Sequence, residues 1–292
     1  MVDDVEKKRR LLIVSGLSGA GKSLVLNSLE DQDFYCIDNL PFSLFDQLAK
    51  LLTAPINDFP EKVGVGIDAR SPEFDLASLP HSIALLRDKG VIVEIIFIEA
   101  SKSALTTRFS ETRRKHPLSS DDMPLTDAID KERRILADLS DIADLRIDTS
   151  HMVVHELRGL IRDRLANRPV ATLSMQFISF GYKHGIPRDA DFVFDVRCLP
   201  NPYWQKHLRM HSGKDQPVKD YLEQQPTVID MVSHIQNFLE QLIPQFESEN
   251  RSYLCIAIGC TGGHHRSVYI VDRISEYFKT LQKHVVIRHR DL

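Results

Sequence analysis

Cysteine, tryptophan and long apolar runs are all scarce in this sequence, and each scarcity excludes a class of protein. The 292 residues contain one tryptophan and four cysteines, which are Cys36, Cys198, Cys255 and Cys260. None of these cysteines has the paired C-x-x-C spacing of a zinc site, and four in a chain of this length do not make a disulfide framework. The nearest candidate for a membrane-spanning helix, Val91–Ile98, is interrupted by Glu94 and is much shorter than the roughly 18 residues required.

The N-terminal sequence MVDDVEKKRR is charged and lacks the apolar core and the cleavage site of a signal peptide. With the unpaired cysteines, this predicts a cytoplasmic protein that has no membrane partner. The formal net charge is −4, which argues against a protein whose whole surface binds nucleic acid. Hydrophobic residues make up 42% and charged residues 27%, as in ordinary globular domains, and the length suggests two domains.

Short apolar segments alternate along the chain with segments of helical spacing. The expected strands are Leu11–Ser15, Phe34–Asp38, Val63–Asp68, Val91–Glu99, Leu145–Asp148, Leu173–Phe180, Phe192–Arg197, Tyr253–Gly259 and Val285–Arg288. The expected helices are Ser23–Leu29, Pro41–Thr53, His81–Lys89, Ala104–Thr112, Leu125–Leu139, Val153–Leu165, Val218–Glu223, Val228–Phe246 and Ser267–Leu281. This alternation predicts an α/β protein with parallel sheets and helices on the faces of the sheets. The segment ANRPVAT suggests a linker at residues 167–172 between domains at residues 1–166 and 173–292.

The segment after the first expected strand matches the phosphate-binding pattern G-x-x-x-x-G-K-[ST]. It consists of Gly16, Leu17, Ser18, Gly19, Ala20, Gly21, Lys22 and Ser23, and it precedes a helical segment. Glycines let the backbone turn tightly and direct N–H groups towards phosphate oxygens at a helix N-terminus. Lys22 would reach the β- and γ-phosphates and Ser23 would bind Mg²⁺, so nucleotide binding is expected. The alternative is a glycine-rich turn without a ligand.

A nucleotide site of this kind also needs an acid for the metal and cations for the transferring phosphoryl group. Asp38 and Asp68 each end an expected strand, and Asp68 is the preferred acid, with a helix cap or a solvated carboxylate as the alternative. Arg70 could touch a phosphate. Arg108, Arg113, Arg114 and His116 follow the fourth expected strand, as in the lid of a small kinase, although charged runs are usually solvated helix faces. The sequence has no Asn-Lys-x-Asp motif to select guanine over adenine.

A second candidate loop, Cys260–Ser267, follows an apolar strand and opens a helix. Its C-x5-R-[ST] spacing is that of cysteine-based phosphatases, in which backbone N–H groups and the arginine surround one phosphate above the thiolate. Three interpretations remain open: a catalytic thiol, an anion-binding loop without chemistry, and a structural turn with a buried cysteine. Catalysis would need a general acid, for which Asp189, Asp191 and Asp195 are candidates.

Basic residues gather near the C-terminal end of the sequence. The candidate RNA contacts are Lys279, Lys283, Arg288 and Arg290, which flank the apolar residues Val285-Val286-Ile287. An exposed edge strand that is protected by charge explains the same pattern equally well.

Seven segments taken together resemble the RapZ family of bacterial P-loop proteins, some of which act as RNase adapters. The segments are GLSGAGKS, FYCIDNLP, TRRKHPLS, IDTS, SFGYKHGIP, DVRCLPNP and AIGCTGGHHRSVY, spread over nearly the whole chain. The resemblance implies a kinase-like P-loop domain that binds and slowly hydrolyses ATP or GTP, followed by an α/β domain similar to a phosphofructokinase subdomain. It also implies a cytoplasmic homo-oligomer, a dimer or a tetramer, with glucosamine-6-phosphate, small regulatory RNA and an endoribonuclease as partners.

The resemblance assigns residues to both ligands. Guanine-nucleotide binding is implied for Asp68, Ala69, Arg70 and Ser71. The phosphosugar pocket is implied for Asn250, Cys260, Thr261, Gly262, Gly263, His265 and Arg266, with His184 and Arg197 as neighbours. Adapter members of the family end in a Lys/Arg-rich tail and have histidine at the position of Tyr203. Because this sequence ends in Arg288-His-Arg-Asp-Leu292, we expect weaker RNA binding with a flatter salt dependence.

Three functions are compatible with the sequence. The first is a two-domain regulator that binds nucleotide, senses an amino-sugar phosphate and presents RNA to an endoribonuclease in the control of cell-envelope precursors. The second is a small-molecule kinase that uses the arginine-rich lid, which rapid phosphate transfer to a sugar or a nucleoside would favour. The third is an RNA-binding protein with a vestigial P-loop, which an unchanged nucleotide affinity after Lys22→Ala would favour.

Overall fold

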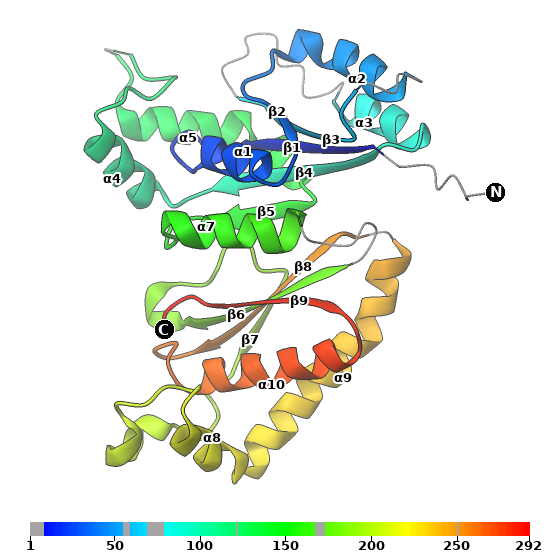
Figure 1. The fold of residues 1–292 in the computed structure, drawn as a ribbon. Coiled ribbons are helices and arrows are strands. Elements are labelled where there is room, and N and C mark those ends of the chain that lie inside the picture. The colour runs from blue at the N-terminus through cyan, green and yellow to red at the C-terminus, as the bar shows by residue number, and fades with distance from the viewer. Residues whose placement is uncertain (1–8, 55–58, 69–78, 121, 167–172, 250) are drawn as a thin grey trace, which may run out of the picture. The chain divides into compact units, whose positions relative to one another are not determined.

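The computed structural model describes residues 9–54, 59–68, 79–120, 122–166, 173–249 and 251–292. The chain divides into two compact units, Met1–Ala166 and Asn167–Leu292 (Figure 1). The expected linker at residues 167–172 lies outside the described residues. Each unit is built on its own parallel sheet with helices, which confirms the predicted α/β fold class. The finer likeness of the second unit to a phosphofructokinase subdomain stays a prediction.

The N-terminal unit contains a five-stranded parallel sheet in the order β2-β3-β1-β4-β5. Its strands are β1 (Arg10–Gly16), β2 (Tyr35–Ile37), β3 (Lys62–Gly66), β4 (Ile92–Glu99) and β5 (Leu145–Asp148). Every residue of β1 is buried, because β3 and β4 pair with its two edges and helices cover both faces. A central parallel strand therefore has a continuous apolar run, as LLIV has here.

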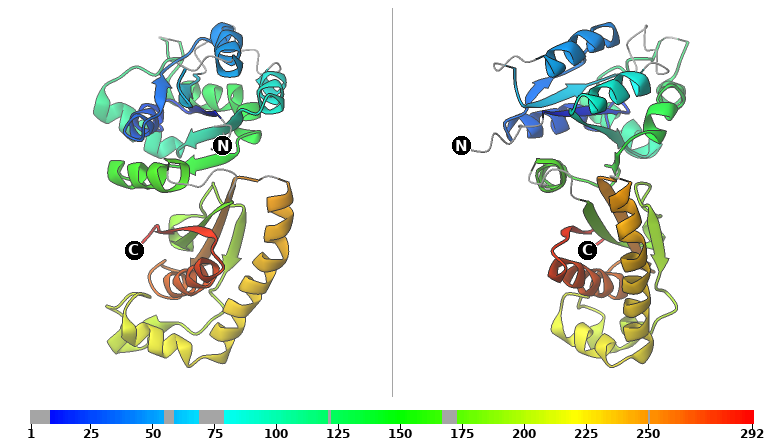
Figure 2. Two further views of the ribbon diagram at one scale, coloured as in Figure 1. Left: turned by 45° about the vertical axis from the view of Figure 1, so that its right-hand side comes forward. Right: turned by 90° about the vertical axis from the view of Figure 1, so that its right-hand side faces the viewer.

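The helices of this unit lie on both faces of the sheet. They are α1 (Lys22–Glu30), α2 (Phe45–Thr53), α3 (Leu79–Asp88), α4 (Lys102–Thr112), α5 (Leu125–Ile135), α6 (Ala137–Asp141) and α7 (Val154–Ile161). In Figures 1 and 2, α2 and α3 lie on the face opposite α1 and α7. The helix expected over Leu125–Leu139 is divided at Leu136, where φ is −94° and ψ is 6°. The helix expected over Val153–Leu165 ends at Ile161, and a π-turn follows over Arg162–Ala166.

The C-terminal unit contains a four-stranded parallel sheet in the order β7-β8-β6-β9. Its elements are β6 (Ser174–Gly181), β7 (Phe192–Asp195), β8 (Tyr253–Cys260), β9 (His284–His289), α8 (Gln216–Glu223), α9 (Pro226–Ser248) and α10 (Arg266–Thr280), with short 3-10 turns at Tyr182–His184, Pro202–Trp204 and Lys206–Leu208. Alternate residues of β6 face opposite sides of the sheet. Met175 and Phe177 join a large apolar cluster with the three helices, whereas Ile178 and Phe180 belong to a smaller cluster on the other face.

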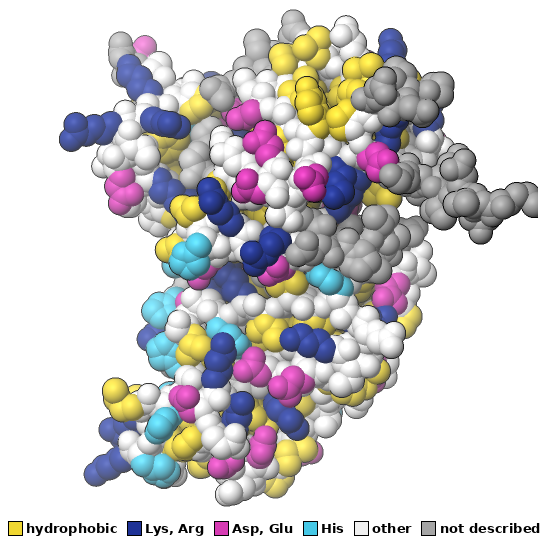
Figure 3. All heavy atoms as spheres, in the orientation of Figure 1, with side chains coloured by type: hydrophobic (Ala, Val, Ile, Leu, Met, Phe, Trp, Pro, Cys, Tyr) yellow, Lys and Arg dark blue, Asp and Glu magenta, His cyan; other side chains and the backbone are white. Residues whose placement is uncertain are grey.

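The surface carries charges of both signs. On the face drawn in Figure 3, Lys and Arg side chains are interspersed with Asp and Glu, in keeping with the small net charge. Strand β9 lies at the edge of its sheet, and all six of its residues are partly exposed, including His284, Arg288 and His289. Within the described ranges, no helix is long and apolar enough to cross a membrane.

Candidate functional site

The chain between β1 and α1 forms a tight loop that packs against β4. At Gly16, φ is +139° and an added Cβ would lie 1.9 Å from the carbonyl oxygen of Ile98, so only glycine fits. The N–H of Leu17 donates to the same carbonyl at 3.0 Å. Gly21 caps α1, and the first two helical residues, Lys22 and Ser23, carry no negative charge. Because first-turn N–H groups have no partner within a helix, this N-terminus is suited to binding an anion.

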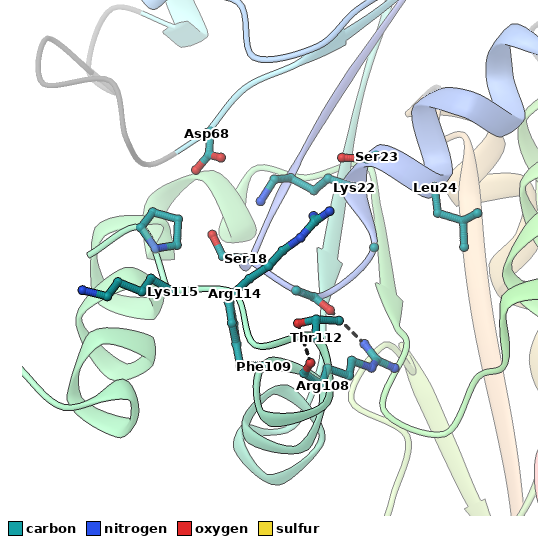
Figure 4. Close-up of a pocket in the computed structure, with 13 residues that line it drawn as sticks. Ser18, Lys22, Ser23, Leu24, Asp68, Arg108, Phe109, Thr112, Arg114 and Lys115 are labelled. Atoms are coloured by element: carbon teal, nitrogen blue, oxygen red, sulfur yellow. Dashed lines mark hydrogen bonds between the residues drawn. The ribbon is translucent and has the colours of Figure 1, made fainter. Parts of the chain in front are cut away.

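A pocket of about 450 Å³ lies beside this loop (Figure 4), within the size range of small-molecule sites. Its lining residues are Ser18, Gly19, Gly21, Lys22, Ser23, Leu24, Asp68, Arg108, Phe109, Thr112, Arg114, Lys115 and Pro117. Four of these side chains are cationic and one, Asp68, is acidic. The Lys22 Nζ donates to the carbonyl of Gly16 at 2.6 Å, which places the ammonium group over the loop.

Asp38 and Asp68, the two acids expected to bind the metal ion, both lie near the loop. The Ser23 Oγ lies 3.5 Å from Asp38 Oδ2, and Asp38 follows β2. Asp68 follows β3, the neighbour of β1, and its buried side chain lines the pocket. Among the described residues, no group of three or more His, Cys, Asp and Glu side chains could hold a metal ion. Three further expected site residues, Ala69, Arg70 and Ser71, lie outside the described residues.

A threonine that the sequence analysis did not single out supports the loop. Thr149, in the segment IDTS, donates from Oγ1 to the carbonyl of Ala20 at 2.8 Å. Arg108 donates to Thr149 Oγ1 at 3.0 Å, to the Thr149 carbonyl at 2.6 Å and to the Gly19 carbonyl at 3.2 Å. Burial lowers the pKa of the Arg108 guanidinium. Side chains from α4 and from the end of β5 therefore hold two carbonyl groups of the loop in place.

The expected lid divides into an exposed and a buried part. Arg114 and Lys115 line the pocket, and Figure 4 shows the Arg114 side chain extending towards Lys22. Arg113 is exposed, with φ at +52°, and does not belong to the pocket lining. His116 is buried instead and does not belong to the pocket lining, although its ring centre lies 5.2 Å from that of Phe109, which does. The lid interpretation therefore places Arg108 and Arg114 at the pocket and misses Lys115, whose only signal is its position next to Arg114.

In the C-terminal unit, Cys260 ends β8 beneath the second candidate loop and is 3% exposed. The N–H of Gly263 donates to its sulfur at 3.2 Å, and the Ser267 hydroxyl lies 3.1 Å from the sulfur. Burial opposes ionisation of the Cys260 thiol, but the hydrogen bonds of Ser267 and Gly263 and the charge of Arg266 lower its pKa overall. A thiol enclosed in this way shapes the loop and is closed to a substrate, which favours the anion-binding and structural interpretations over catalysis.

Arg266 is also buried, at 4% exposure, and its guanidinium donates hydrogen bonds to backbone carbonyl groups. Its Nη1 donates to the carbonyls of Arg197 and Leu199, each at 2.9 Å, and its Nη2 lies 3.4 Å from the Thr261 hydroxyl. Burial lowers the pKa of its guanidinium. The arginine thus joins the loop to the segment that follows β7, a role that differs from the phosphate-clasping role expected from the C-x5-R spacing.

The exposed part of the second loop lies against the turn that follows β6. A Cβ at Gly181 would lie 2.6 Å from the carbonyl carbon of Gly262, so glycine permits this close approach. The Lys183 N–H donates to the carbonyl of Thr261 at 3.3 Å, and Thr261 is exposed. His184, also exposed, belongs to the same turn. Thr261 and His184, both expected at the phosphosugar pocket, therefore lie in one exposed region.

Of two other residues expected at the phosphosugar pocket, one is exposed and the other is buried. Arg197 is exposed and forms a bidentate ion pair with Asp195, and its guanidinium lies 3.9 Å from the ring centre of Tyr182, which belongs to the turn after β6. His265 is buried at 9% exposure, where burial lowers the pKa of its imidazole, so it does not belong to the exposed region. Asn250 lies outside the described residues.

The candidate RNA contacts are not equally accessible. Arg290 donates to the carbonyls of Gly181 and Gly185 and pairs with Asp291, and its side chain is only 4% exposed. The Asp291 carboxylate accepts the Gly181 N–H at 2.7 Å. This buried arrangement differs from the expected surface contact and makes Arg290 a support of the turn after β6. Lys279 is exposed, Arg288 is partly exposed, and Lys283 pairs with Glu247 at 2.6 Å.

Solved structures resemble part of the chain only weakly. An unliganded sugar kinase from Janibacter sp. matches with a TM-score of 0.35 and 16% identity, covering 52% of this chain and 92% of that one. A gluconokinase from Sinorhizobium meliloti matches with a TM-score of 0.36 and 14% identity, covering 53% and 91%. At these values, the likeness carries no conclusion about activity.

Sequence comparisons match the chain over almost its whole length. The RapZ-like N-terminal domain matches residues 9–168, and the RapZ C-terminal domain matches residues 173–292. A relative from Halorhodospira halophila, named nucleotide-binding protein, is 48% identical over 285 residues, which cover 97% of this chain and 98% of the relative. A relative of the same name from Azotobacter vinelandii is 47% identical over 283 residues, covering 97% and 99%. The chain therefore belongs to the RapZ family.

Proposed function

We propose that the N-terminal unit binds ATP or GTP together with Mg²⁺ and hydrolyses it slowly at most. The observation that carries the proposal is the loop from Gly16 to Ser23, whose helix N-terminus and Lys22 border a pocket lined by four cationic side chains. Backbone N–H groups at a helix N-terminus and several cations are the partners that a polyphosphate needs. The names of the relatives, nucleotide-binding protein, support the same ligand class.

The side chains near the loop fit a nucleotide-bound Mg²⁺. Ser23, Asp38 and Asp68 offer hard oxygen atoms, which Mg²⁺ prefers, and it usually combines one or two carboxylates with phosphate oxygens. The ion would reduce the negative charge of the phosphates. Lys22 would leave the Gly16 carbonyl to contact the β- and γ-phosphates, while Thr149 and Arg108 hold the loop in shape. Ser23→Ala should therefore weaken the Mg²⁺ dependence of binding more than binding without the ion.

Lys22→Ala tests the nucleotide site directly. Removing the ammonium group should weaken nucleotide binding by about 10-fold or more, the effect of one charge-assisted hydrogen bond to phosphate. Isothermal titration calorimetry with ATP and with GTP in Mg²⁺ measures the dissociation constants. The matched control is Lys50→Ala, an exposed lysine of α2 that does not line the pocket and should leave the affinity unchanged. Equal affinities for wild type and Lys22→Ala would contradict the proposed site.

We also propose that the C-terminal unit senses glucosamine-6-phosphate at the region formed by Thr261, His184 and Arg197, with Cys260 and Arg266 holding the loop. Support comes from the two exposed basic side chains beside a loop at the start of α10, a suitable setting for a phosphate. The family also motivates the finer proposal of a homo-oligomeric RNase adapter that binds small regulatory RNA. Calorimetric titration of the full chain with glucosamine-6-phosphate, compared with inorganic phosphate and glucosamine, tests the sugar site, and no heat with any of them would contradict it.

A small-molecule kinase is the second candidate, and the observation that favours it is the pair of cations that the segment after α4 brings to the pocket. Arg114 and Lys115 line the pocket beside the loop residues, and cations at such a site stabilise a transferring phosphoryl group. Incubation with ATP and a panel of sugars and nucleosides distinguishes the two functions. Rapid formation of a phosphorylated product would favour the kinase, whereas slow release of inorganic phosphate alone would favour the regulator.

A further inference from the structure

A buried carboxylate lies directly behind the P-loop. Glu132 of α5 is 0% exposed and accepts two hydrogen bonds from Ser18, one from the backbone N–H at 2.9 Å and one from the hydroxyl at 2.7 Å. Burying an ionised carboxylate is costly unless hydrogen bonds satisfy it. The two bonds to one residue of the loop show that Glu132 fixes the position of the loop and that the Ser18 N–H is directed to Glu132.

His116 completes the set of hydrogen bonds around this carboxylate. Its Nε2 lies 3.1 Å from Glu132 Oε2, and both side chains are fully buried. The Leu118 N–H donates to its Nδ1 at 3.2 Å. Because Nδ1 accepts a hydrogen bond, the ring proton lies on Nε2, and the imidazole donates it to Glu132. A continuous chain of hydrogen bonds therefore runs from Leu118 through His116 and Glu132 to Ser18.

His116 is the one buried residue in the stretch 111–117, all of which the structure describes. Its exposed neighbours Arg114, Lys115 and Pro117 all line the pocket. The segment has left α4, which ends at Thr112, so no helical hydrogen bonds hold these neighbours. The hydrogen bond from His116 to Glu132 thus anchors the segment that brings the two cations to the pocket.

We propose that His116 and Glu132 are positioning residues that tie the Arg114–Lys115 segment to the P-loop and thereby favour a nucleoside triphosphate over a diphosphate. This inference rests on the proposed nucleotide site. The loop backbone holds the phosphates that both nucleotides share and Lys22 spans the β- and γ-phosphates, whereas Arg114 and Lys115 meet the additional charge of the outermost phosphate. Neither Ser18–Glu132 hydrogen bond involves His116, so we expect a substitution at His116 to leave the loop in place.

Two substitutions of matched chemistry test the link. His116→Asn keeps an amide near the Nδ1 position, where it can accept the Leu118 N–H, but it is too short to reach Glu132. His116→Gln places an amide nitrogen near the Nε2 position, where it can still donate to Glu132. We expect His116→Asn to reduce the ratio of ATP affinity to ADP affinity by about 10-fold, the loss of one charge-assisted hydrogen bond to phosphate. His116→Gln should keep most of the wild-type ratio.

Calorimetry of the full chain with ATP and with ADP, both in excess Mg²⁺, gives the ratio for each variant. Glu94→Gln is the control, because it perturbs a different buried carboxylate of the same unit, paired with Arg10 at 2.8 Å, and should leave the ratio unchanged. The inference is overturned if His116→Asn and His116→Gln give the same ratio, or if Glu94→Gln lowers it as much as His116→Asn does. A wild-type chain that binds neither nucleotide overturns the proposed nucleotide site itself, and the inference with it.

Discussion

Replacing Arg266 by alanine should destabilise the C-terminal unit, because this arginine donates hydrogen bonds to two backbone carbonyl groups. The side chain is 4% exposed, and its Nη1 holds the carbonyls of Arg197 and Leu199, each at 2.9 Å. Alanine would leave both carbonyls without this donor, and the hydrogen bond to the Leu199 carbonyl is buried. It would also remove the charge that favours the Cys260 thiolate.

The magnitude follows from the two hydrogen bonds. A hydrogen bond to a charged group contributes about 1.5–3 kcal/mol to stability, and contributions from one side chain are not fully additive. We therefore expect Arg266→Ala to lower the free energy of unfolding by about 3–5 kcal/mol, at the upper end of single-substitution effects. Arg266→Lys should recover only part of this loss, because the lysine side chain ends one bond short of the Nη1 position and lacks the Nη2 group that lies beside the Thr261 hydroxyl.

Urea unfolding followed by far-UV circular dichroism measures the effect, fitted with separate transitions if the two units unfold independently. Arg273→Ala is the control in the same unit, since its ion pair with Glu276 is exposed at 3.9 Å and should contribute about 0.5 kcal/mol or less. A loss below about 1 kcal/mol for Arg266→Ala, accompanied by complete loss of phosphosugar binding, would refute this reasoning and show that the guanidinium serves the ligand.

Two further predictions concern the supports of the loops. Burial opposes ionisation of Asp291, but hydrogen bonds from Arg290 and Gly181 lower its pKa below the ordinary value. The ionised carboxylate therefore stabilises the fold above the unfolded-state pKa of about 3.9, and this stabilisation is lost as the pH falls through the folded-state pKa. Asp291→Asn should therefore lower the urea midpoint at neutral pH, by an amount that shrinks below about pH 4; a difference that stays constant down to acid unfolding would contradict this. Thr149→Val removes the hydroxyl that donates to Ala20 and should cost about 1–3 kcal/mol of stability and weaken nucleotide binding, as measured by unfolding and calorimetry, whereas unchanged values for both would show that the hydroxyl is dispensable.

The strands and the P-loop could be predicted from the sequence because their signals are local. An apolar run such as Val91–Glu99 is almost the same as the observed β4, Ile92–Glu99, since a parallel strand buried on both faces has apolar residues at successive positions. The phosphate-binding pattern fixes both the residue types and their spacing, and the loop forms where it predicts. The break of α5 at Leu136 has no comparable signal, because the surrounding sequence keeps its helical spacing.

The partners of the buried polar side chains could not be predicted. Ser18 and Glu132 are 114 positions apart in sequence, and Thr149 is 129 positions from Ala20, so neither contact has a local pattern. The spacing from Cys260 to Arg266 likewise indicates that the two share one loop, but not where the guanidinium points. That direction depends on the carbonyls of the segment after β7, which only the folded chain brings within reach.

The single tryptophan gives the molecule a built-in optical reporter. Trp204 lies in the C-terminal unit, in the 3-10 turn that follows Asn201, and 73% of its surface is exposed. Fluorescence excited selectively at the indole therefore reports on that unit alone, because the tyrosines and phenylalanines of the other unit are not excited. A ligand or a macromolecule that covers this side chain should shift its emission to shorter wavelengths, and a nucleotide confined to the P-loop should not, so occupancy of the two halves can be followed separately without attaching a dye.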